Sequence, residues 1–441
     1  MKPKRPKRYK PDRLDASAIT PELALEWRAP RFGTENPQRM NNPLWEWLVK
    51  TRIDAYSAGD RFGYPSPFAA GPAWCFARFG QSVTALPDGR VILIAGEHED
   101  SYDPDFHIYN DVTLYHPDGK LDLFGYPETV FPPTDFHTAT LLDDRIIVIG
   151  NLGYPDNRKA GITQIAELDL NTFAIRLIRS TGTPPGWIHK HIAELAPDQK
   201  SIQVRGGLID PAYKDRFSLL ENPDAWSLDL GTWAWTRLTQ HPWERHVFYA
   251  EGVRVLPLWQ MGNLPWSMQY DRGSKPDPDK PAPQKIVPAE KWKEFQDRFG
   301  KTNPKAQADA AGLYAKGYNP DLEVFGQLYQ PALPHTAIPE PESNDEETAD
   351  EGYDENGPYD WDEEDYSQPG DVFDGTRISV NGVVARYTDN RNQMVLTIEG
   401  KLPPETVRIL VGDLRGKLEI LLNRPVITRR LQEPTRVTPA K

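Results

Sequence analysis

The chain of 441 residues contains a single cysteine, Cys75, so no disulfide can form within it. Long apolar runs are also missing, and none approaches the roughly 18 residues that a membrane-spanning helix needs. No apolar core follows the basic N-terminal residues, as it would in a secretory signal. These absences predict a cytoplasmic protein in a reducing compartment, with no membrane association.

Catalytic signatures are equally scarce. The sequence has no glycine-rich phosphate loop, serine elbow, nucleotide fingerprint or H-E-x-x-H pattern. Acidic residues are plentiful, but no spacing singles out two of them as a general acid/base pair. The expectation is therefore a protein that is not an enzyme and has no cofactor and no metal.

Positive charge is absent from residues 317–376, which hold 18 acidic residues and no Lys or Arg. The net charge of −13 conceals this asymmetry, because the rest of the chain sums to +5. The most acidic part, residues 331–372, has too little aliphatic content to order itself. It is also aromatic, which favours partner contacts through Tyr353, Asp354, Tyr359, Trp361, Glu363, Glu364 and Asp365.

Three interpretations of this acidic segment stay open. It is a solvated linker, a cover for a basic face of the same chain, or a phosphate mimic that enters a basic active site of a partner. Seven basic residues in the first thirteen positions make the N-terminal arm one such basic face. A basic tail this short is weak evidence for phosphate contacts, so a nucleic-acid partner is not expected.

A threefold repeat is the main positive signal. Apolar strands are predicted at 91–97, 146–152 and 201–207, and successive copies lie 55 residues apart when aligned on Arg90, Arg145 and Lys200. A polar loop follows each strand, and the next strand ends at His116, Asp169 or Asp229. Four residues later a last short strand opens, so each unit is predicted to have four antiparallel strands.

The repeat resembles the kelch repeat over about residues 77–240. The third copy carries Gly206-Gly207, Asp229 and Trp233, the second carries Gly150, Asp169 and Phe173, and the first keeps only Gly96. The resemblance implies a mainly β fold, either a kelch-like β-propeller or a partial propeller. Closed propellers have roughly four to eight blades. A fourth copy is expected to begin at His246, with its apolar strand from Gly252.

Five regions follow from this pattern. They are a basic, Pro-rich arm (1–40), a kelch-like repeat domain with an N-terminal helix (41–270), a Pro-rich linker with short helices (271–330), the acidic segment (331–372) and a small α/β domain (373–433). The N-terminal helix is predicted from Asn42-Pro43 to Gly59. The α/β domain is predicted as β-β-α-β, with strands at 377–387, 393–398 and 426–431 and a helix from Leu402.

Propeller loops between the second and third strands lie on one rim, which the resemblance makes the candidate partner-binding surface. In this chain they are residues 97–110, 152–163 and 207–223. The candidate partner-binding residues are Glu97, His98, Glu99, Asp100, Tyr102, Asp103, Asp105, His107, Tyr154, Asp156, Tyr213, Lys214 and Asp215.

Two other features are predicted to be structural. His189 and His191 share one face of a strand, which suits a metal, but His191 repeats the position of Gln81 and His137. Some kelch-like propellers are copper radical oxidases that need a Cys–Tyr cross-link. Cys75 precedes the first repeat and is predicted to be a buried, inert cysteine.

The predicted function is a non-catalytic, protein-binding scaffold with a protein partner. A narrower version is an intracellular inhibitor or immunity-type protein that blocks a toxin or enzyme. Two alternatives stay open. One is a carbohydrate-binding or carbohydrate-active propeller that stacks sugars on Trp226 or Trp233, and the other is a structural subunit of a larger assembly. The oligomeric state is left open.

Overall fold

The computed structural model describes residues 6–98, 103–159, 161–210, 220–253, 289–299, 329–338, 375–390 and 392–432. These residues form two compact units that divide near Gln240. The described residues up to Thr239 make the first unit, and those from Gln240 onward make the second. Both units are built on antiparallel sheets, so the fold is mainly β, as the repeat predicts.

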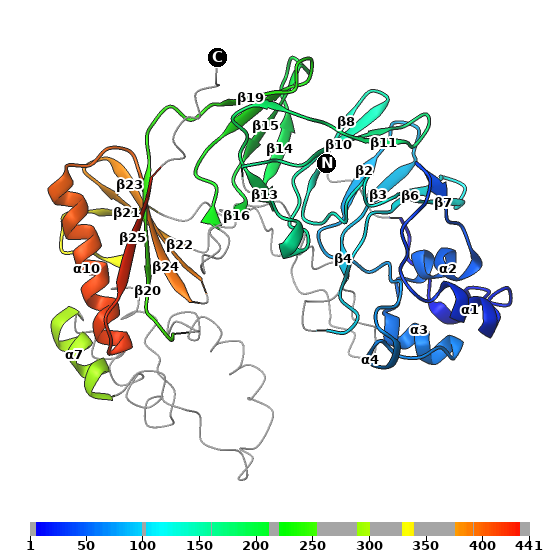
Figure 1. Ribbon diagram of the computed structural model, residues 1–441, viewed down its shortest axis with the longest axis horizontal. Helices are drawn as coiled ribbons and strands as arrows, with labels where there is room; N and C mark the ends of the chain where they lie inside the picture. The colour runs from blue at the N-terminus through cyan, green and yellow to red at the C-terminus, as the bar shows by residue number, and fades with distance from the viewer. Residues whose placement is uncertain are drawn as a thin grey trace, which may run out of the picture. The chain divides into compact units, whose positions relative to one another are not determined.

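Three antiparallel sheets of the first unit correspond to the three repeats (Figure 1). The first has the order β1-β7-β6-β3-β2, from Gln38–Arg39, Leu121–Gly125, Val112–Tyr115, Val91–Ile94 and Ser82–Ala85. The second has the order β11-β10-β9-β8, from Ile175–Leu177, Ile165–Asp169, Arg145–Ile149 and Thr138–Leu142. The third has the order β12-β19-β18-β15-β14, from Thr181–Gly182, Ala234–Arg237, Trp226–Asp229, Ser201–Arg205 and Ile192–Leu195. Strand β12 joins its sheet in parallel, and all the other pairs are antiparallel.

The three sheets are linked to one another at equivalent positions. Strand β8 lies against both β2 and β14. The Phe136 amide donates to the Gly80 carbonyl at 2.9 Å, and the Lys190 amide donates to the Phe136 carbonyl at 2.8 Å. All three residues have a left-handed backbone, with φ of 62°, 48° and 54° in chain order. The repeat is therefore a structural repeat, in which each sheet is tied to the previous one in the same way.

The aspartates that recur in the second and third copies of the repeat each shape a turn. Asp169 accepts hydrogen bonds from the amides of Asn171 and Thr172, and Asp229 does the same for Gly231 and Thr232. These bonds hold the turn that leads into the last strand of each sheet. The aromatic residues that follow, at 173 and 233, both have a left-handed backbone, with φ of 58° and 57°.

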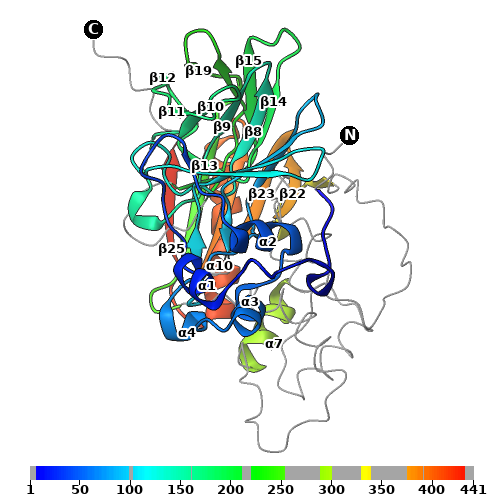
Figure 2. The same ribbon diagram turned by 90° about the vertical axis from the view of Figure 1, so that its right-hand side faces the viewer.

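Four helices come before the first repeat, and the first three share a hydrophobic core with its sheet (Figure 1 and Figure 2). They are α1 (Pro21–Trp27), α2 (Pro43–Thr51), α3 (Ala55–Phe62) and α4 (Pro67–Ala70). Helix α2 begins as predicted, because the Asn42 side chain accepts from the Trp45 amide. Its predicted extension to Gly59 is wrong: Arg52 is left-handed and Asp54 caps a separate helix. Trp45 stacks on Trp74 with ring centroids 4.5 Å apart, inside the cluster that joins helices and sheet.

The second unit is one six-stranded antiparallel sheet with helices beside it (Figure 1). Its order is β21-β22-β23-β24-β20-β25, from Thr336–Ile338, Gly375–Val380, Val383–Asn390, Gln393–Glu399, Glu244–Tyr249 and Ile427–Gln432. The helices are α7 (Ala289–Phe299) and α10 (Pro404–Leu422). Leu410, Leu414 and Leu418 of α10 pack on the sheet, so the predicted apolar stripe is confirmed.

Two strand predictions need correction. The expected single strand 377–387 is a hairpin, because Asn381 and Gly382 have φ of 51° and 78° and make a tight turn. The expected fourth repeat at His246 is wrong, since β20 pairs with β24 and β25 of the second unit. Val247 and Phe248 are both fully buried there, which explains why this stretch looks like an apolar repeat strand. None of the helices in the described ranges has the length and apolar character of a membrane span.

Candidate functional site

The three predicted loops each carry local structure. Loop 97–110 contains a hairpin of β4 (Glu97–His98) and β5 (His107–Ile108). Loop 152–163 contains a single 3₁₀ turn, η2 (Pro155–Asn157). Loop 207–223 contains β16 (Leu208–Asp210) and β17 (Leu220–Glu221), which join β13 (Trp187–His189) in a three-stranded sheet.

The middle loop contacts both of the others. The Ile108 amide of the first loop donates to the Tyr154 hydroxyl at 2.9 Å, and Phe106 packs edge-to-face on Tyr154 with ring centroids 5.8 Å apart. On the other side, Arg158 forms an ion pair with Asp210, with Nη1 and Oδ2 3.3 Å apart. The structure therefore brings the three predicted loops together as one continuous surface, hereafter the loop surface.

The predicted residues differ in their exposure. Asp156 is exposed, whereas Glu97, Asp103, His107 and Tyr154 are half-buried. Asp103 accepts from the Tyr56 hydroxyl of α3 at 2.7 Å, which fixes the hairpin beside the helices. The remaining predicted loop residues, Glu99, Asp100, Tyr102, Tyr213, Lys214 and Asp215, lie outside the described residues. The same holds for all the singled-out residues of the acidic segment, from Tyr353 to Asp365.

His98 and Asp105 were expected to face a partner, and the structure corrects this. Their residues expose only 3% and 0% of their surface, and His98 Nε2 lies 2.9 Å from Asp105 Oδ2. His98 Nδ1 donates to the Ala77 carbonyl at 2.8 Å. Burial disfavours a charged imidazole, but the Cys75 thiol group and Asp105 outweigh it and raise the pKa of His98 well above its ordinary value. The pair stabilises the hairpin from inside.

Cys75 lies beside this pair, which makes a cysteine–histidine–aspartate combination. Such a combination serves nucleophilic catalysis only where a substrate reaches the sulfur. Cys75 is fully buried, its amide donates to the Tyr109 hydroxyl at 3.0 Å, and its sulfur lies 3.6 Å from the Ile53 carbonyl oxygen. In this conformation the thiol is enclosed, as predicted.

A polar cluster at the base of the loop surface escaped the sequence reasoning. Asp135 is fully buried, and its Oδ1 accepts from the Gly153 amide at 2.7 Å. Burial raises the pKa of Asp135, and the carboxyl group of Glu97 lies near it. Asp135 belongs to no motif, so only the fold shows that it meets Glu97.

Arg158 and His189 complete the cluster. Arg158 also donates to the carbonyls of Leu152 and Gly153, at 3.0 and 3.2 Å, and so fixes the shape of its own loop. His189 is buried, and neither ring nitrogen has a hydrogen-bond partner within the described ranges. Burial and the nearby cations, Lys190 and Arg158, lower the pKa of His189 well below its ordinary value. The imidazole is therefore neutral.

The repeated histidines form hydrogen-bond contacts with neighbouring sheets. His137 Nε2 lies 2.8 Å from the Ser82 hydroxyl, and His191 Nε2 lies 2.9 Å from the Thr138 hydroxyl. Burial lowers the pKa of each histidine to about 3. No group of three potential metal-ligating side chains occurs among the described residues. These contacts agree with the structural role predicted for His191.

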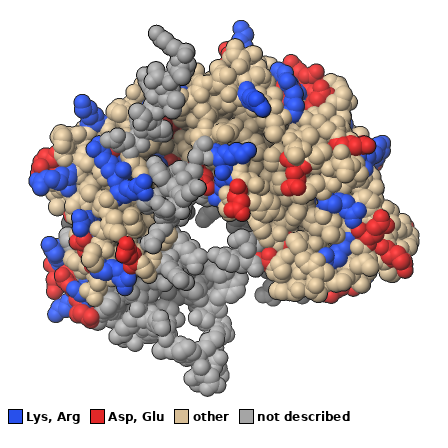
Figure 3. Space-filling view, in the orientation of Figure 1, with Lys and Arg blue, Asp and Glu red and all other residues tan. Residues whose placement is uncertain are grey.

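Exposed apolar side chains lie on or near the loop surface. Ile162 belongs to the middle loop and is 51% exposed. Phe68 of α4 is 77% exposed, and its ring lies 5.9 Å from that of Tyr56, which bonds to Asp103 of the first loop. On the face shown in Figure 3, basic and acidic side chains of the first unit are interspersed. That face therefore carries charges of both signs rather than a field of one sign.

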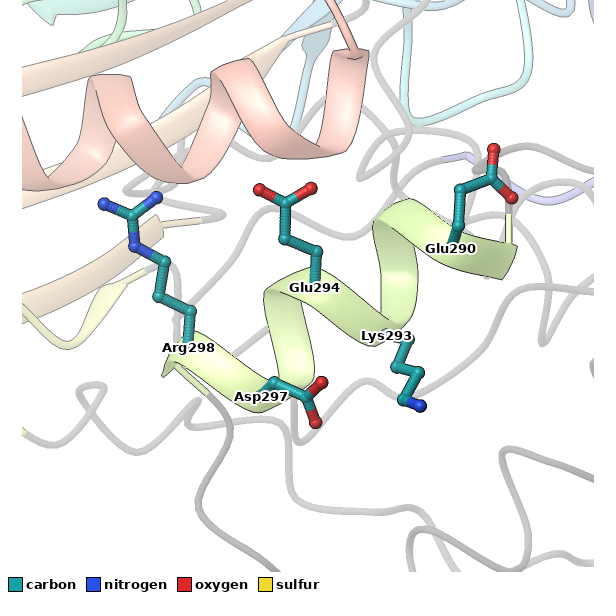
Figure 4. A pocket seen from close by; sticks show the side chains of 5 residues that line it. All are labelled: Glu290, Lys293, Glu294, Asp297 and Arg298. Atoms are coloured by element: carbon teal, nitrogen blue, oxygen red, sulfur yellow. The ribbon is translucent and has the colours of Figure 1, made fainter.

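The second unit has a shallow surface depression that is lined by charged rather than apolar side chains (Figure 4). Its described lining is five charged side chains of α7: Glu290, Lys293, Glu294, Asp297 and Arg298. Glu294 also pairs with Lys291 at 3.0 Å. Charges of both signs are mixed along one solvated helix, so this depression selects no class of ligand.

Comparisons with known proteins add little. No protein-family model matches the chain. No curated protein matches it either. One solved structure that aligns with it is titled "Structure of YjhT", with 14% sequence identity and a TM-score of 0.24. The alignment covers 36% of this chain and 51% of that one, so it spans about half of that structure's chain.

Proposed function

We propose that the protein is a non-catalytic scaffold that binds a protein partner through the loop surface. In this proposal the three sheets are blades of a kelch-like propeller or partial propeller, whose loops present the binding residues. The observation that carries it is the joining of the three loops through Tyr154 and Arg158. A surface already held in shape loses less conformational entropy when a partner binds.

The side chains on this surface support a protein as the ligand. Phe68 and Ile162 are large, exposed and apolar, and such residues act as anchors when a partner covers them. Tyr154 is half-buried with a rigid ring, and Asp156 beside it is exposed. A narrower version of the proposal is an inhibitor or immunity-type protein that covers a toxin or enzyme with this surface.

A photo-crosslinking amino acid at Ile162 or Phe68 tests the proposal in extracts of the organism that encodes the chain. The matched controls are Leu177 of β11 and Leu238, which are exposed apolar positions at 43% and 38% but lie outside the three loops. One discrete adduct from both test positions and from neither control is expected. Adducts that form equally at all four positions, or none at any, contradict the proposal.

A second candidate is carbohydrate binding at the base of the same loops. Glu97 and Arg158 are both half-buried, and their carboxylate and guanidinium groups are of the kind that bind sugar hydroxyls. Of the two tryptophans first considered for stacking, Trp226 is buried in the core at 6% exposure, whereas Trp233 is half-buried beside the same core. Sugar affinity that disappears in Glu97→Gln but persists when Ile162 is replaced by Ser would favour this candidate over the first.

A further inference from the structure

The described part of the N-terminal arm has a period of three residues. Lys10 has φ of −64° and ψ of 131°, close to polyproline II, and the next residues form the 3₁₀ turn η1 (Pro11–Arg13). Both conformations have about three residues per turn, so side chains three positions apart point in the same direction. Exposure follows this period, because residues 8, 11 and 14 are half-buried while the other residues from 7 to 15 are exposed.

The half-buried row attaches the arm to α2. The Arg8 guanidinium donates to the Thr51 carbonyl at 3.0 Å, and Leu14 packs on the cluster that joins the helices to the first sheet. The backbone adds a further bond, since the Tyr9 amide donates to the Lys50 carbonyl at 2.9 Å. The arm is therefore held in one orientation, and its remaining side chains face outward.

One of the outward rows consists only of cations. Lys7, Lys10 and Arg13 are all exposed, and none of them pairs with a carboxylate among the residues that the structure describes. The nearest acidic residue in the chain, Asp12, is paired with Arg61 at 3.0 Å. Three positions correspond to roughly 6–9 Å along the arm, so the three charges form a line, hereafter the cation row.

We propose that residues 339–372 of the same chain, the part of the acidic segment that follows β21, bind the cation row. These residues include fifteen acidic side chains and neither Lys nor Arg. Like charges in one block repel each other and favour an oppositely charged partner. Trp361 stands directly before four consecutive acidic residues, and an indole face also attracts lysine and arginine cations.

The acidic segment is long enough to reach the cation row. It connects β21, which ends at Ile338, to β22, which begins at Gly375, so the connection has 36 residues. Fixed at both ends, such a loop extends to at most about 60 Å, which is half of its contour. A unit of the first unit's size has a radius of gyration of about 18 Å. The contact therefore does not require one particular arrangement of the two units.

A nucleic acid is the competing occupant, because the same cations can contact phosphates. Three cations make few phosphate contacts, however, and binding that rests on few contacts is weak at physiological salt. The acidic segment is tethered to the same chain, so it acts at an effective concentration of order millimolar. An anionic partner in solution must exceed this concentration to displace it, which favours the segment as the occupant.

Carbodiimide cross-linking of the unmodified full-length protein tests the contact. The reagent couples a lysine amine to an adjacent carboxylate, so Lys7 and Lys10 report on the cation row directly. Mass spectrometry should find peptides that join Lys7 or Lys10 to residues 340–371, with a yield that does not change on dilution. Lys120 and Lys200, exposed lysines of the first unit outside the arm, are the matched controls and should couple several-fold less.

Charge reversal then tests the electrostatic argument. Lys7→Glu combined with Arg13→Glu leaves Lys10 as the reporter, and its yield should fall about threefold or more, as the loss of surface ion pairs predicts. Lys120→Glu combined with Lys200→Glu changes the net charge by the same amount and should leave the yield at Lys10 unaltered. Equal yields at Lys10 in the two double variants contradict the proposal.

Three other results also overturn it. Coupling from Lys7 and Lys10 to a second molecule shows a different occupant. Equal coupling of the segment to Lys10, Lys120 and Lys200 shows random collision. Absence of a cross-link from the arm, while Lys291 couples to Glu294 at 3.0 Å, shows that the chemistry worked and that the segment does not bind the cation row.

Discussion

At the scale of single residues, the buried histidines of the first unit differ in charge for a physical reason. His137 and His191 face hydroxyl groups and no carboxylate, so burial lowers their pKa to about 3 and keeps them neutral. His98 faces Asp105 in the interior, so it is held as a cation. The sequence marks all three only as histidines near strands. Which of them is charged depends on what the fold places beside each ring.

The two neutral histidines, His137 and His191, predict that the folded protein loses stability in acid. In the unfolded chain these imidazoles titrate near 6.5, and in the folded protein near 3. The unfolded state therefore binds more protons in this window, so stability is full above pH 6.5 and is lost as the pH falls toward 3. The double variant His137→Asn, His191→Asn should be less stable at pH 7 but lose less stability on acidification. Urea midpoints across this range measure it, with His241→Asn, an exposed histidine, as the control.

The charged histidine, His98, predicts the opposite dependence of stability on pH. Because the folded-state pKa of His98 is raised, its contribution to stability is full below pH 6.5 and is lost as the pH rises through the folded-state value. Asp105→Asn removes the partner of a buried charge, which costs about 3–5 kcal/mol. Denaturant titrations at pH 6 and at alkaline pH should show a smaller penalty at the higher pH. A penalty that grows with pH would contradict a charged His98.

At the scale of elements, single residues at strand ends decide whether neighbouring sheets can pack against each other. Gly150 ends the apolar strand β9 with φ of 83°, and a Cβ there would lie 2.5 Å from both the Ile188 carbonyl oxygen and the His191 ring. The neighbouring sheet thus requires a glycine at this position. The repeat pattern predicted a glycine role here. It did not predict the left-handed residues Phe136 and Lys190, because bulky side chains rarely adopt that backbone.

Two alanine substitutions should have opposite effects. Gly150→Ala places a Cβ on a left-handed backbone and too close to the next sheet. It should therefore destabilise the first unit by about 2 kcal/mol or more. Gly412→Ala lies in α10, where an added Cβ meets nothing within 4 Å, and should stabilise the second unit by about 0.5–1 kcal/mol. Thermal unfolding of the two variants beside the parent measures both effects. Equal shifts of one sign would contradict the packing described for Gly150.

At the scale of the whole molecule, the loop surface depends on contacts between residues far apart in the chain. Tyr154 joins loop 97–110, and Arg158 joins Asp210, fifty-two residues away. If the proposed function is correct, Arg158→Ala should weaken partner binding about tenfold while the unfolding temperature of the protein changes little. Arg205→Ala is the control, since its exposed pair with Glu194, 3.5 Å apart, lies on β14 and β15. Equal binding losses in the two variants would count against the loop surface.

The sequence by itself determined the local pattern. Strand periodicity and turn residues specified four strands in each of the three sheets, the cap at Asn42 and the apolar stripe of α10, because each depends on residues near one another in the chain. They did not predict β1 and β12, which add a fifth strand to the first and third sheets. Only the tertiary structure decided where β20 belongs, since its apolar residues suit either a fourth repeat or the second unit's sheet. It also decided that Asp135 meets Glu97 and that His98 points inward. Such pairings join residues that no local pattern relates, and burial then sets their charge.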